Sequence, residues 1–125
     1  MKKTMYLIDV INEKAEVVKA DGLDDFYRLI DCDTIDIVTR KIGRRYYDII
    51  CDDNGLFADG PKISAIDDCG SIMFVGNLLI AGLHDEEGEL TDLTEDDIAY
   101  IADRIERMGT RTYPAGYMML TQCSY

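Results

Sequence analysis

Apolar residues are densest between Ile72 and Leu83, the longest nearly uncharged run of the chain. They do not alternate with polar residues, a pattern typical of a strand that is buried on both faces. A helix is the alternative, but Gly76 and Gly82 would weaken it. At twelve residues the run is also too short to cross a membrane as a helix. We therefore expect the fold to be centred on this strand.

The N-terminal part of the chain predicts a hairpin followed by a helix. Residues 4–11 are rich in strand formers, residues 12–14 form a polar break, and residues 15–19 return as the second arm. The next apolar residues are spaced at i, i+3, i+4 and i+7, so they share one helical face. They are Leu23, Phe26, Tyr27 and Ile30. This pattern indicates a helix over about 23–30 that lies on the sheet.

Strands are also expected over residues 33–39, 46–51 and 62–66, where strand formers are bounded by polar turns. The second of these strands runs into Asn54 and Gly55, the strongest short hairpin signal because both residues tolerate a positive φ. A calcium site is the alternative at this turn. We prefer the hairpin, since the alternating carboxylate spacing of an EF-hand is missing.

A second helix is predicted over about 94–108. Thr94 is a suitable N-cap, and three carboxylates follow it in the first turn, where the helix dipole favours negative charge. The apolar stripe of this helix consists of Ile98, Ile101, Ala102, Ile105 and Met108. Gly109 is a fitting residue just beyond its C-terminus. Residues 117–123 are typical of a final edge strand.

These elements predict an α+β fold, with a single, mostly antiparallel β-sheet and two helices, about 23–30 and 94–108, packed against it. A chain of 125 residues corresponds to a single globular domain over 1–125. Such a chain buries about two-thirds of its unfolded surface, so it needs no disulfide or metal to fold.

The chain has 13 Lys and Arg against 25 Asp and Glu, a net charge of −12. Direct binding to nucleic acid or to an anionic membrane is therefore not expected, since both need a basic surface. A basic host protein is the favoured partner, although acidity also serves solubility alone. No signal peptide is recognised at the N-terminus, and the four cysteines are too widely spaced for a zinc knuckle. We therefore expect a cytoplasmic protein with reduced thiols.

Carboxylates are concentrated after the central apolar run. Eight of the thirteen residues from 85 to 97 are acidic, and none is Lys or Arg. They are Asp85, Glu86, Glu87, Glu89, Asp92, Glu95, Asp96 and Asp97. One interpretation is an interaction surface, a docking face that imitates nucleic-acid phosphates toward a basic groove. A solvated loop before a well-capped helix is the other, and the residues alone favour it, since capping accounts for three of the eight.

A second candidate site is basic and aromatic. Arg44, Arg45 and Tyr47 are close in sequence, with Tyr46 between them. Lining a pocket, they would bind a small anion or nucleotide, with arginine holding the anion and tyrosine stacking on a ring. Ordinary surface arginines beside a strand are the alternative interpretation.

The sequence matches none of the common catalytic templates. Cys51 and His84 would supply a nucleophile and a base only if the fold brought them together. Cys51 at a strand end is more typical of a buried thiol. We therefore expect no catalytic residue, no cofactor and no metal site, and we rank an enzyme last among the possible functions.

Four segments follow one another in an order that resembles a known family. They are YDIICDDNGL (47–56), VGNLLI (75–80), DEEGEL (85–90) and LTEDDI (93–98). They resemble the domain of unknown function 3846 family over about residues 5–105. Its members are small proteins of phages, plasmids and bacteria, and no catalytic residue or ligand comes with the family. The resemblance implies a mobile-element accessory protein, a group in which antagonists of host defence are common.

We therefore predict a small acidic protein that acts by binding, as a protein–protein interaction module or host-defence antagonist. Binding of a small anion or nucleotide is the alternative. The expected edge strand at 117–123 leaves two oligomeric states open, a monomer and a strand-paired homodimer.

Overall fold

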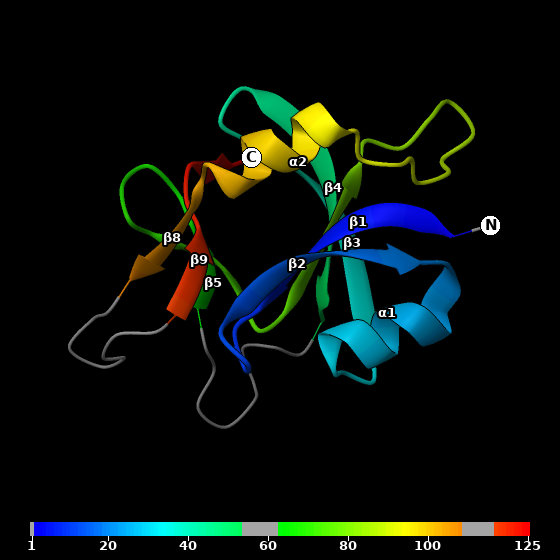
Figure 1. Ribbon diagram of the computed structural model, residues 1–125, viewed down its shortest axis with the longest axis horizontal. Coiled ribbons are helices and arrows are strands. Elements are labelled where there is room, and N and C mark those ends of the chain that lie inside the picture. The colour runs from blue at the N-terminus through cyan, green and yellow to red at the C-terminus, as the bar shows by residue number, and fades with distance from the viewer. Residues whose placement is uncertain (1, 54–62, 109–116) are drawn as a thin grey trace.

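The structure, a computed structural model, describes residues 2–53, 63–108 and 117–125 of the chain. Six strands form a large sheet with the order β10-β3-β4-β7-β1-β2 (Figure 1). They are β1 (Lys3–Asp9), β2 (Lys14–Ala20), β3 (Ile35–Ile42), β4 (Arg45–Asp52), β7 (Leu78–Gly82) and β10 (Cys123–Ser124). Four further strands form a smaller sheet with the order β6-β5-β9-β8. They are β5 (Ile63–Ile66), β6 (Ile72–Val75), β8 (Ile105–Met108) and β9 (Tyr117–Leu120).

The α+β class, with mostly antiparallel strands and two helices, is confirmed. Among the described strands, only β5 and β9 meet in parallel, and the other neighbours are antiparallel. The helices are α1 (Gly22–Ile30) and α2 (Glu95–Ala102). β1 and β2 form the expected hairpin, paired along their whole length. The small sheet is an addition that the apolar pattern did not predict.

One face of the large sheet is covered by α1. Phe26 and Ile30 of this helix pack against a cluster that includes Leu7, Ile50 and Leu79. The helix follows the expected spacing of apolar residues and ends where Asp31 takes a left-handed conformation, with φ of 63°. The apolar face that the sequence predicts for this helix is therefore the face that packs on the sheet.

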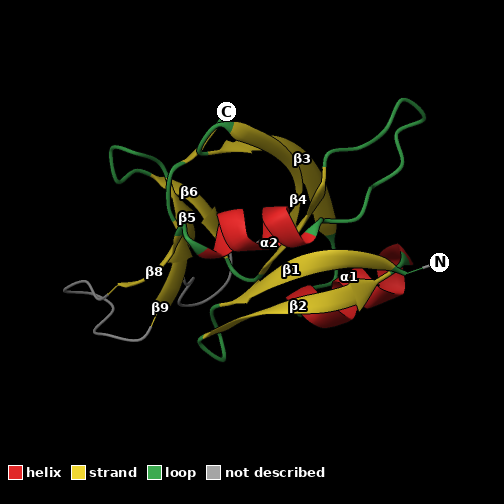
Figure 2. Ribbon diagram, turned by 45° about the horizontal axis from the view of Figure 1, so that its top comes forward, coloured by secondary structure: helices red, strands yellow, loops and turns green. Residues whose placement is uncertain are grey.

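The opposite face packs against α2 and the small sheet. Ile101 of α2, Ile105 of β8 and Leu120 of β9 join Ile49 and Ile80 in one cluster. Figure 2 shows α2 inside the curve of the strands, whereas α1 lies on the other side of the β1–β2 hairpin. Because side chains alternate along a strand, neighbouring residues of β4 and β7 contribute to both clusters.

The prediction of one central strand over 72–83 is wrong, because the structure has two strands there, β6 and β7. The chain turns at Gly76, where φ is +79°, so β6 joins the small sheet and β7 joins the large one. Every residue of β7 is buried, but Ile72 in β6 is 57% exposed. The prediction of a strand buried on both faces therefore holds for Leu78–Gly82 alone.

The second helix begins as expected but is shorter than the predicted 94–108. Thr94 and Asp97 form a reciprocal capping box at its start, and the helix ends at Ala102. The next apolar residues extend as β8, in which Ile105 pairs with Leu120. Ile105 reaches the core from a strand rather than from a helix, because pairing with β9 outweighs the helical spacing.

The prediction of an edge strand over 117–123 is wrong for residues 117–120. β9 lies between β5 and β8, so it is an inner strand of the small sheet. The chain then crosses to the large sheet, where β10 pairs with β3 at the edge. The predicted Asn54-Gly55 turn and the proposed helix-ending Gly109 lie outside the described residues. No helix within the described ranges combines the length and the apolar character that crossing a membrane requires.

Gly76 provides a test of the turn between β6 and β7. Its positive φ favours glycine, and a Cβ at this position would meet no heavy atom within 4 Å. Gly76→Ala therefore isolates backbone strain, and we expect it to lower the free energy of unfolding by about 1 kcal/mol in urea denaturation. Gly76→Asn is the matched control and should lose less, because asparagine tolerates the left-handed region. Equal losses for both variants would contradict this explanation.

Candidate functional site

The acidic loop, defined here as residues 84–92, connects β7 to α2 and projects from the body of the molecule (Figure 1). Asp85 organises it: its carboxylate accepts the backbone N–H groups of Glu87 at 2.9 Å and Glu89 at 3.0 Å. Two backbone bonds close the turn, from Gly88 N–H to the Asp85 carbonyl and from Asp85 N–H to the Glu89 carbonyl. The loop is thus an ordered turn.

The C-terminal stem of the acidic loop is fixed to the large sheet. Thr91 forms an isolated bridge with Gly82, and its hydroxyl donates to the Leu83 carbonyl at 2.9 Å. The next residue, Asp92, accepts the backbone N–H of Thr4 through its carboxylate at 2.7 Å. These bonds connect the loop to β7 and to the start of β1.

The N-terminal stem of the acidic loop is held by a buried carboxylate. Asp48, in the middle of β4, is 2% exposed. One of its oxygens accepts the backbone N–H of His84 at 2.8 Å and lies 2.9 Å from His84 Nδ1. Its other oxygen accepts the Thr39 hydroxyl at 2.6 Å. Through these contacts Asp48 orients the His84 ring and fixes where the loop begins.

Arg45 and Tyr47 of β4 meet the first turn of α2. Arg45 Nη1 lies 2.9 Å from Asp96 Oδ2 and 3.4 Å from Asp97 Oδ1, and its guanidinium is 4.1 Å from the ring centre of Tyr100. The Tyr47 hydroxyl donates to Asp97 Oδ1 at 2.8 Å. The two candidate sites therefore touch: the basic and aromatic residues of one bind carboxylates of the other.

The pKa of Asp97 reflects these contacts. Burial acts to raise it, but the hydrogen bonds from Thr94 and Tyr47, with the charge of Arg45, lower the pKa below its usual range. Burial and the bond to Asp97 raise the pKa of Tyr47 to about 12. Asp97 is therefore held ionised, and it anchors α2 to the sheet.

The structure divides the eight predicted acidic residues into two groups. Four have structural bonds, to backbone N–H groups, to a hydroxyl or to Arg45: they are Asp85, Asp92, Asp96 and Asp97. The other four form no hydrogen bond or ion pair through their side chains with any part of the chain that the structure describes. These free carboxylates are Glu86, Glu87, Glu89 and Glu95, and all are exposed.

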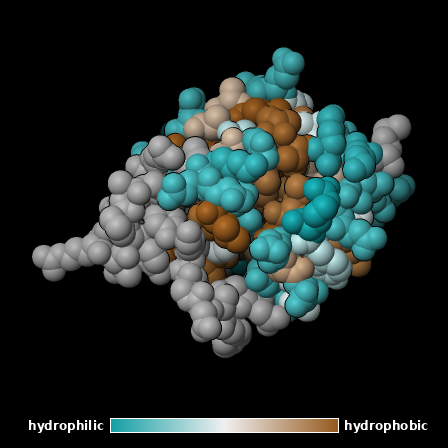
Figure 3. Space-filling view, turned by 60° about the horizontal axis from the view of Figure 1, so that its bottom comes forward, coloured by the Kyte–Doolittle hydropathy of each residue, from teal (hydrophilic) through white to brown (hydrophobic). Residues whose placement is uncertain are grey.

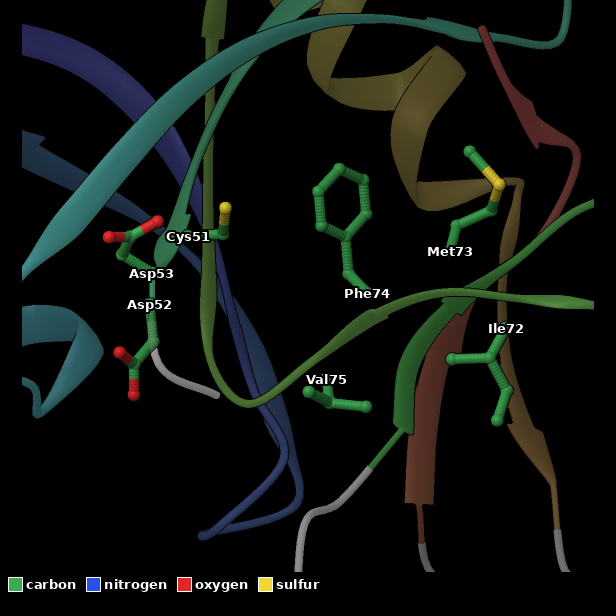
Figure 4. Close-up of a pocket in the computed structure, with 7 residues that line it drawn as sticks. All are labelled: Cys51, Asp52, Asp53, Ile72, Met73, Phe74 and Val75. Atoms are coloured by element: carbon green, nitrogen blue, oxygen red, sulfur yellow. The ribbon is translucent and has the colours of Figure 1, made fainter. Parts of the chain in front are cut away.

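The three residues of the predicted basic and aromatic site do not line a common pocket among the described residues. Tyr47 is buried, and Arg45 is paired with α2. Arg44 is exposed at the β3–β4 turn, where its backbone N–H donates to the Tyr100 hydroxyl at 2.7 Å. One cavity of the molecule lies elsewhere, beside Cys51 and Phe74; Figure 4 shows the Asp52 and Asp53 carboxylates pointing away from Phe74.

Cys51 and His84 do not come together. The Cys51 thiol is on the face of the large sheet that packs against α2, and it donates to the Asp36 carbonyl at 3.6 Å. His84 bonds to Asp48, whose side chain lies on the opposite face. Burial, followed by the charge of Asp36, raises the pKa of the Cys51 thiol to about 11, so the thiol is protonated at neutral pH.

Asp48 and Thr39 are the residues of this site that the sequence analysis missed. The sequence feature that could have identified Asp48 is its position as a single carboxylate within the apolar run of a predicted strand, directly before Ile49 and Ile50. A buried charge of this kind needs hydrogen-bond partners. The sequence does not identify them, because His84 is far away along the chain and Thr39 is on a different strand.

Asp97 and Asp96 form a matched pair for testing the contacts of α2. Asp97→Asn removes several bonds to a partly buried carboxylate, and we expect it to cost about 1–2 kcal/mol of unfolding free energy at neutral pH. Asp96→Asn removes one exposed ion pair and should cost about 0.5 kcal/mol or less.

The same variants give a pH test. Because the pKa of Asp97 is lowered in the folded state, its stabilisation is present above the unfolded value of about 4 and is lost as the pH falls. The difference between the wild-type protein and Asp97→Asn should therefore narrow in urea denaturation below about pH 4. A difference that stays constant across that range would contradict the assignment.

Asp48→Ala tests the anchor of the acidic loop. The change leaves the Thr39 hydroxyl and the His84 N–H without their acceptor, and we expect a loss of about 2–3 kcal/mol. His84→Ala is the control: it keeps the backbone bond and removes a ring that is 48% exposed, so it should cost about 1 kcal/mol or less. Amide hydrogen exchange should accelerate in residues 84–90 more strongly in Asp48→Ala. The opposite ranking would contradict the anchoring role.

Comparison with known proteins finds one family. The family model described as Domain of unknown function (DUF3846) matches residues 1–106 of the 125-residue chain. No match is found among curated proteins or among solved structures. The matched region spans β1 to α2 and includes Asp48, the acidic loop and the carboxylates of the α2 N-terminus. This chain belongs to the DUF3846 family of domains of unknown function.

Proposed function

We propose that this protein is a small cytoplasmic binding module that uses the acidic loop and the α2 N-terminus to dock on a basic protein. The observation that carries the proposal is the combination of an ordered, projecting loop with carboxylates that the fold does not use. Asp85, Asp92 and Asp48 fix the loop, and Glu86, Glu87 and Glu89 extend from it into solvent.

The charge around the acidic loop supports a basic partner. Residues 63–103 contain eleven Asp and Glu and neither Lys nor Arg. A surface with an excess of negative charge attracts an oppositely charged partner over several ångströms, raises the association rate and repels nucleic acid. The acidic loop, with Glu95 of the first turn of α2, thus presents charge like that of nucleic-acid phosphates, and the proposed partner has a basic groove of the kind that binds them.

The order of the acidic loop supports the same proposal. A disordered acidic segment loses conformational entropy when it binds, and that loss subtracts from affinity. Here, hydrogen bonds to the Asp85 carboxylate and from the Thr91 hydroxyl have already restricted the backbone. The free glutamates therefore approach a partner from a backbone that is largely fixed.

The biological setting of the proposal follows from the family resemblance. We propose a mobile-element accessory protein that antagonises a nucleic-acid-handling protein of its host. Binding of a small anion at Arg44 is the second candidate. It is weaker, because Arg45 and Tyr47 are already bonded to Asp96 and Asp97.

The test removes only the free carboxylates of the acidic loop. The triple variant Glu86→Gln, Glu87→Gln and Glu89→Gln keeps Asp85, so the turn should remain folded. The matched control, Glu13→Gln, Asp24→Asn and Asp33→Asn, changes the net charge equally at exposed positions on other elements. Both variants and the wild-type protein serve as bait in host lysate at low and high salt, and captured proteins are identified by mass spectrometry.

We expect the wild-type protein and the control to capture a basic protein at low salt. The amount captured should fall about tenfold or more with the triple variant. High salt should weaken the capture because it screens exposed charges. A captured protein that binds the triple variant as well as the control would refute the acidic loop as the docking site. The same conclusion would follow if the wild-type protein captured no basic protein more strongly than the triple variant does.

A further inference from the structure

Carboxylates at the rim of an interface mainly set the association rate and the specificity. Affinity usually depends on a few apolar or aromatic side chains that lose contact with water, surrounded by polar residues. If the acidic loop docks on a basic protein, an apolar anchor is therefore expected beside it. Exposed apolar side chains occur at several places on this molecule, and Figure 3 shows one face where such side chains lie among polar ones.

Two exposed apolar residues, Tyr46 and Leu83, are placed at the start of the acidic loop. Tyr46 is 51% exposed and Leu83 is 43% exposed. The ladder between β4 and β7 ends with the pair Tyr47 and Gly82, and these two residues are the next ones beyond that pair. Leu83 directly precedes the acidic loop, so the anchor and the loop share one stem.

The Asp48 bonds hold this stem in place. Side chains two residues apart on a strand lie on the same face, so Tyr46 and Asp48 share the α1 side of β4. His84, which follows Leu83, is bonded to Asp48 through both its backbone N–H and its ring. The exposed tyrosine and the start of the acidic loop are therefore tied to the same strand.

The Tyr46 ring already accepts a cation. Lys41, opposite Tyr46 on β3, places Nζ 5.6 Å from the ring centre. The face of an aromatic ring attracts Lys and Arg side chains, and the contact is stronger when water is excluded. A basic partner can thus replace Lys41 on this ring while its other cations face the acidic loop.

We propose, building on the proposed function, that Tyr46 and Leu83 form the apolar anchor of the docking surface. The partner segment is a basic amphipathic helix. Its apolar side chains cover Leu83 and the edge of Tyr46, one Lys or Arg lies on the Tyr46 ring, and further cations face Glu86, Glu87 and Glu89. Opposite charge on the acidic loop selects the basic helix, and the apolar contact slows its dissociation.

The experiment uses two synthetic helical peptides of equal charge. Both carry Lys and Arg on one face; the first has Leu on the other face, and the second has Ser at those positions. Their dissociation constants are measured by fluorescence anisotropy with the full chain, with Tyr46→Ser/Leu83→Ser, and with the control Val17→Ser/Ile72→Ser. The control removes two apolar side chains that are similarly exposed, on β2 and β6. Circular dichroism shows whether each variant is folded.

We expect the Leu peptide to bind the wild-type protein about tenfold or more tightly than the Ser peptide. The Tyr46→Ser/Leu83→Ser variant should remove most of that difference while keeping the salt dependence, and the Val17→Ser/Ile72→Ser control should retain it. Equal binding of the two peptides would overturn the anchor and leave the acidic docking surface intact, since charge alone would then explain binding. If neither peptide bound, or if the control lost as much affinity as the test variant, the anchor would also be refuted.

Discussion

The burial of β7 on both faces is the constraint on which this fold depends. Its five residues lie between β4 and β1 in the middle of the large sheet, and all are buried. A strand of this kind needs apolar layers on both sides. The helix α1 supplies one layer, and α2 with the small sheet supplies the other. The chain leaves β7 at the end of the strand, and the acidic loop connects it to α2.

The sequence predicts best the parts of the fold whose causes are local. The β1–β2 hairpin, α1 and the capped start of α2 each follow from spacing or capping within a few residues. The sequence predicts less well the parts that depend on distant partners. The second helix ends at Ala102 because β8 pairs with β9, and the apolar run over 72–83 divides because its two halves join different sheets. Gly76 was visible as a helix breaker, but its role as the turn between sheets was not.

The candidate site shows the same division. The acidic run is plain in the sequence, and so is the capping role of its last members. Which carboxylates belong to the fold depends on long-range partners: Thr4 binds Asp92, Tyr47 binds Asp97, and Asp48 binds His84. Arg45 was grouped with a possible ligand site because its carboxylate partners lie on another element. Spacing alone could not show that the basic residues of one candidate site neutralise part of the other.

This division separates the carboxylates of the acidic run that stabilise the fold from those that belong to the proposed docking surface. Glu86, Glu87 and Glu89 repel one another and form no ion pair within the described residues, although Lys3 lines the same hollow as Glu89, so they add little to folding. A need for solubility alone would be met as well by charges spread over the surface. Placing them on a turn that Asp85 and Asp48 hold in position concentrates the repulsion where an oppositely charged partner would relieve it. The exposed residues of the acidic loop can therefore be substituted without changing the bonds that fix its shape.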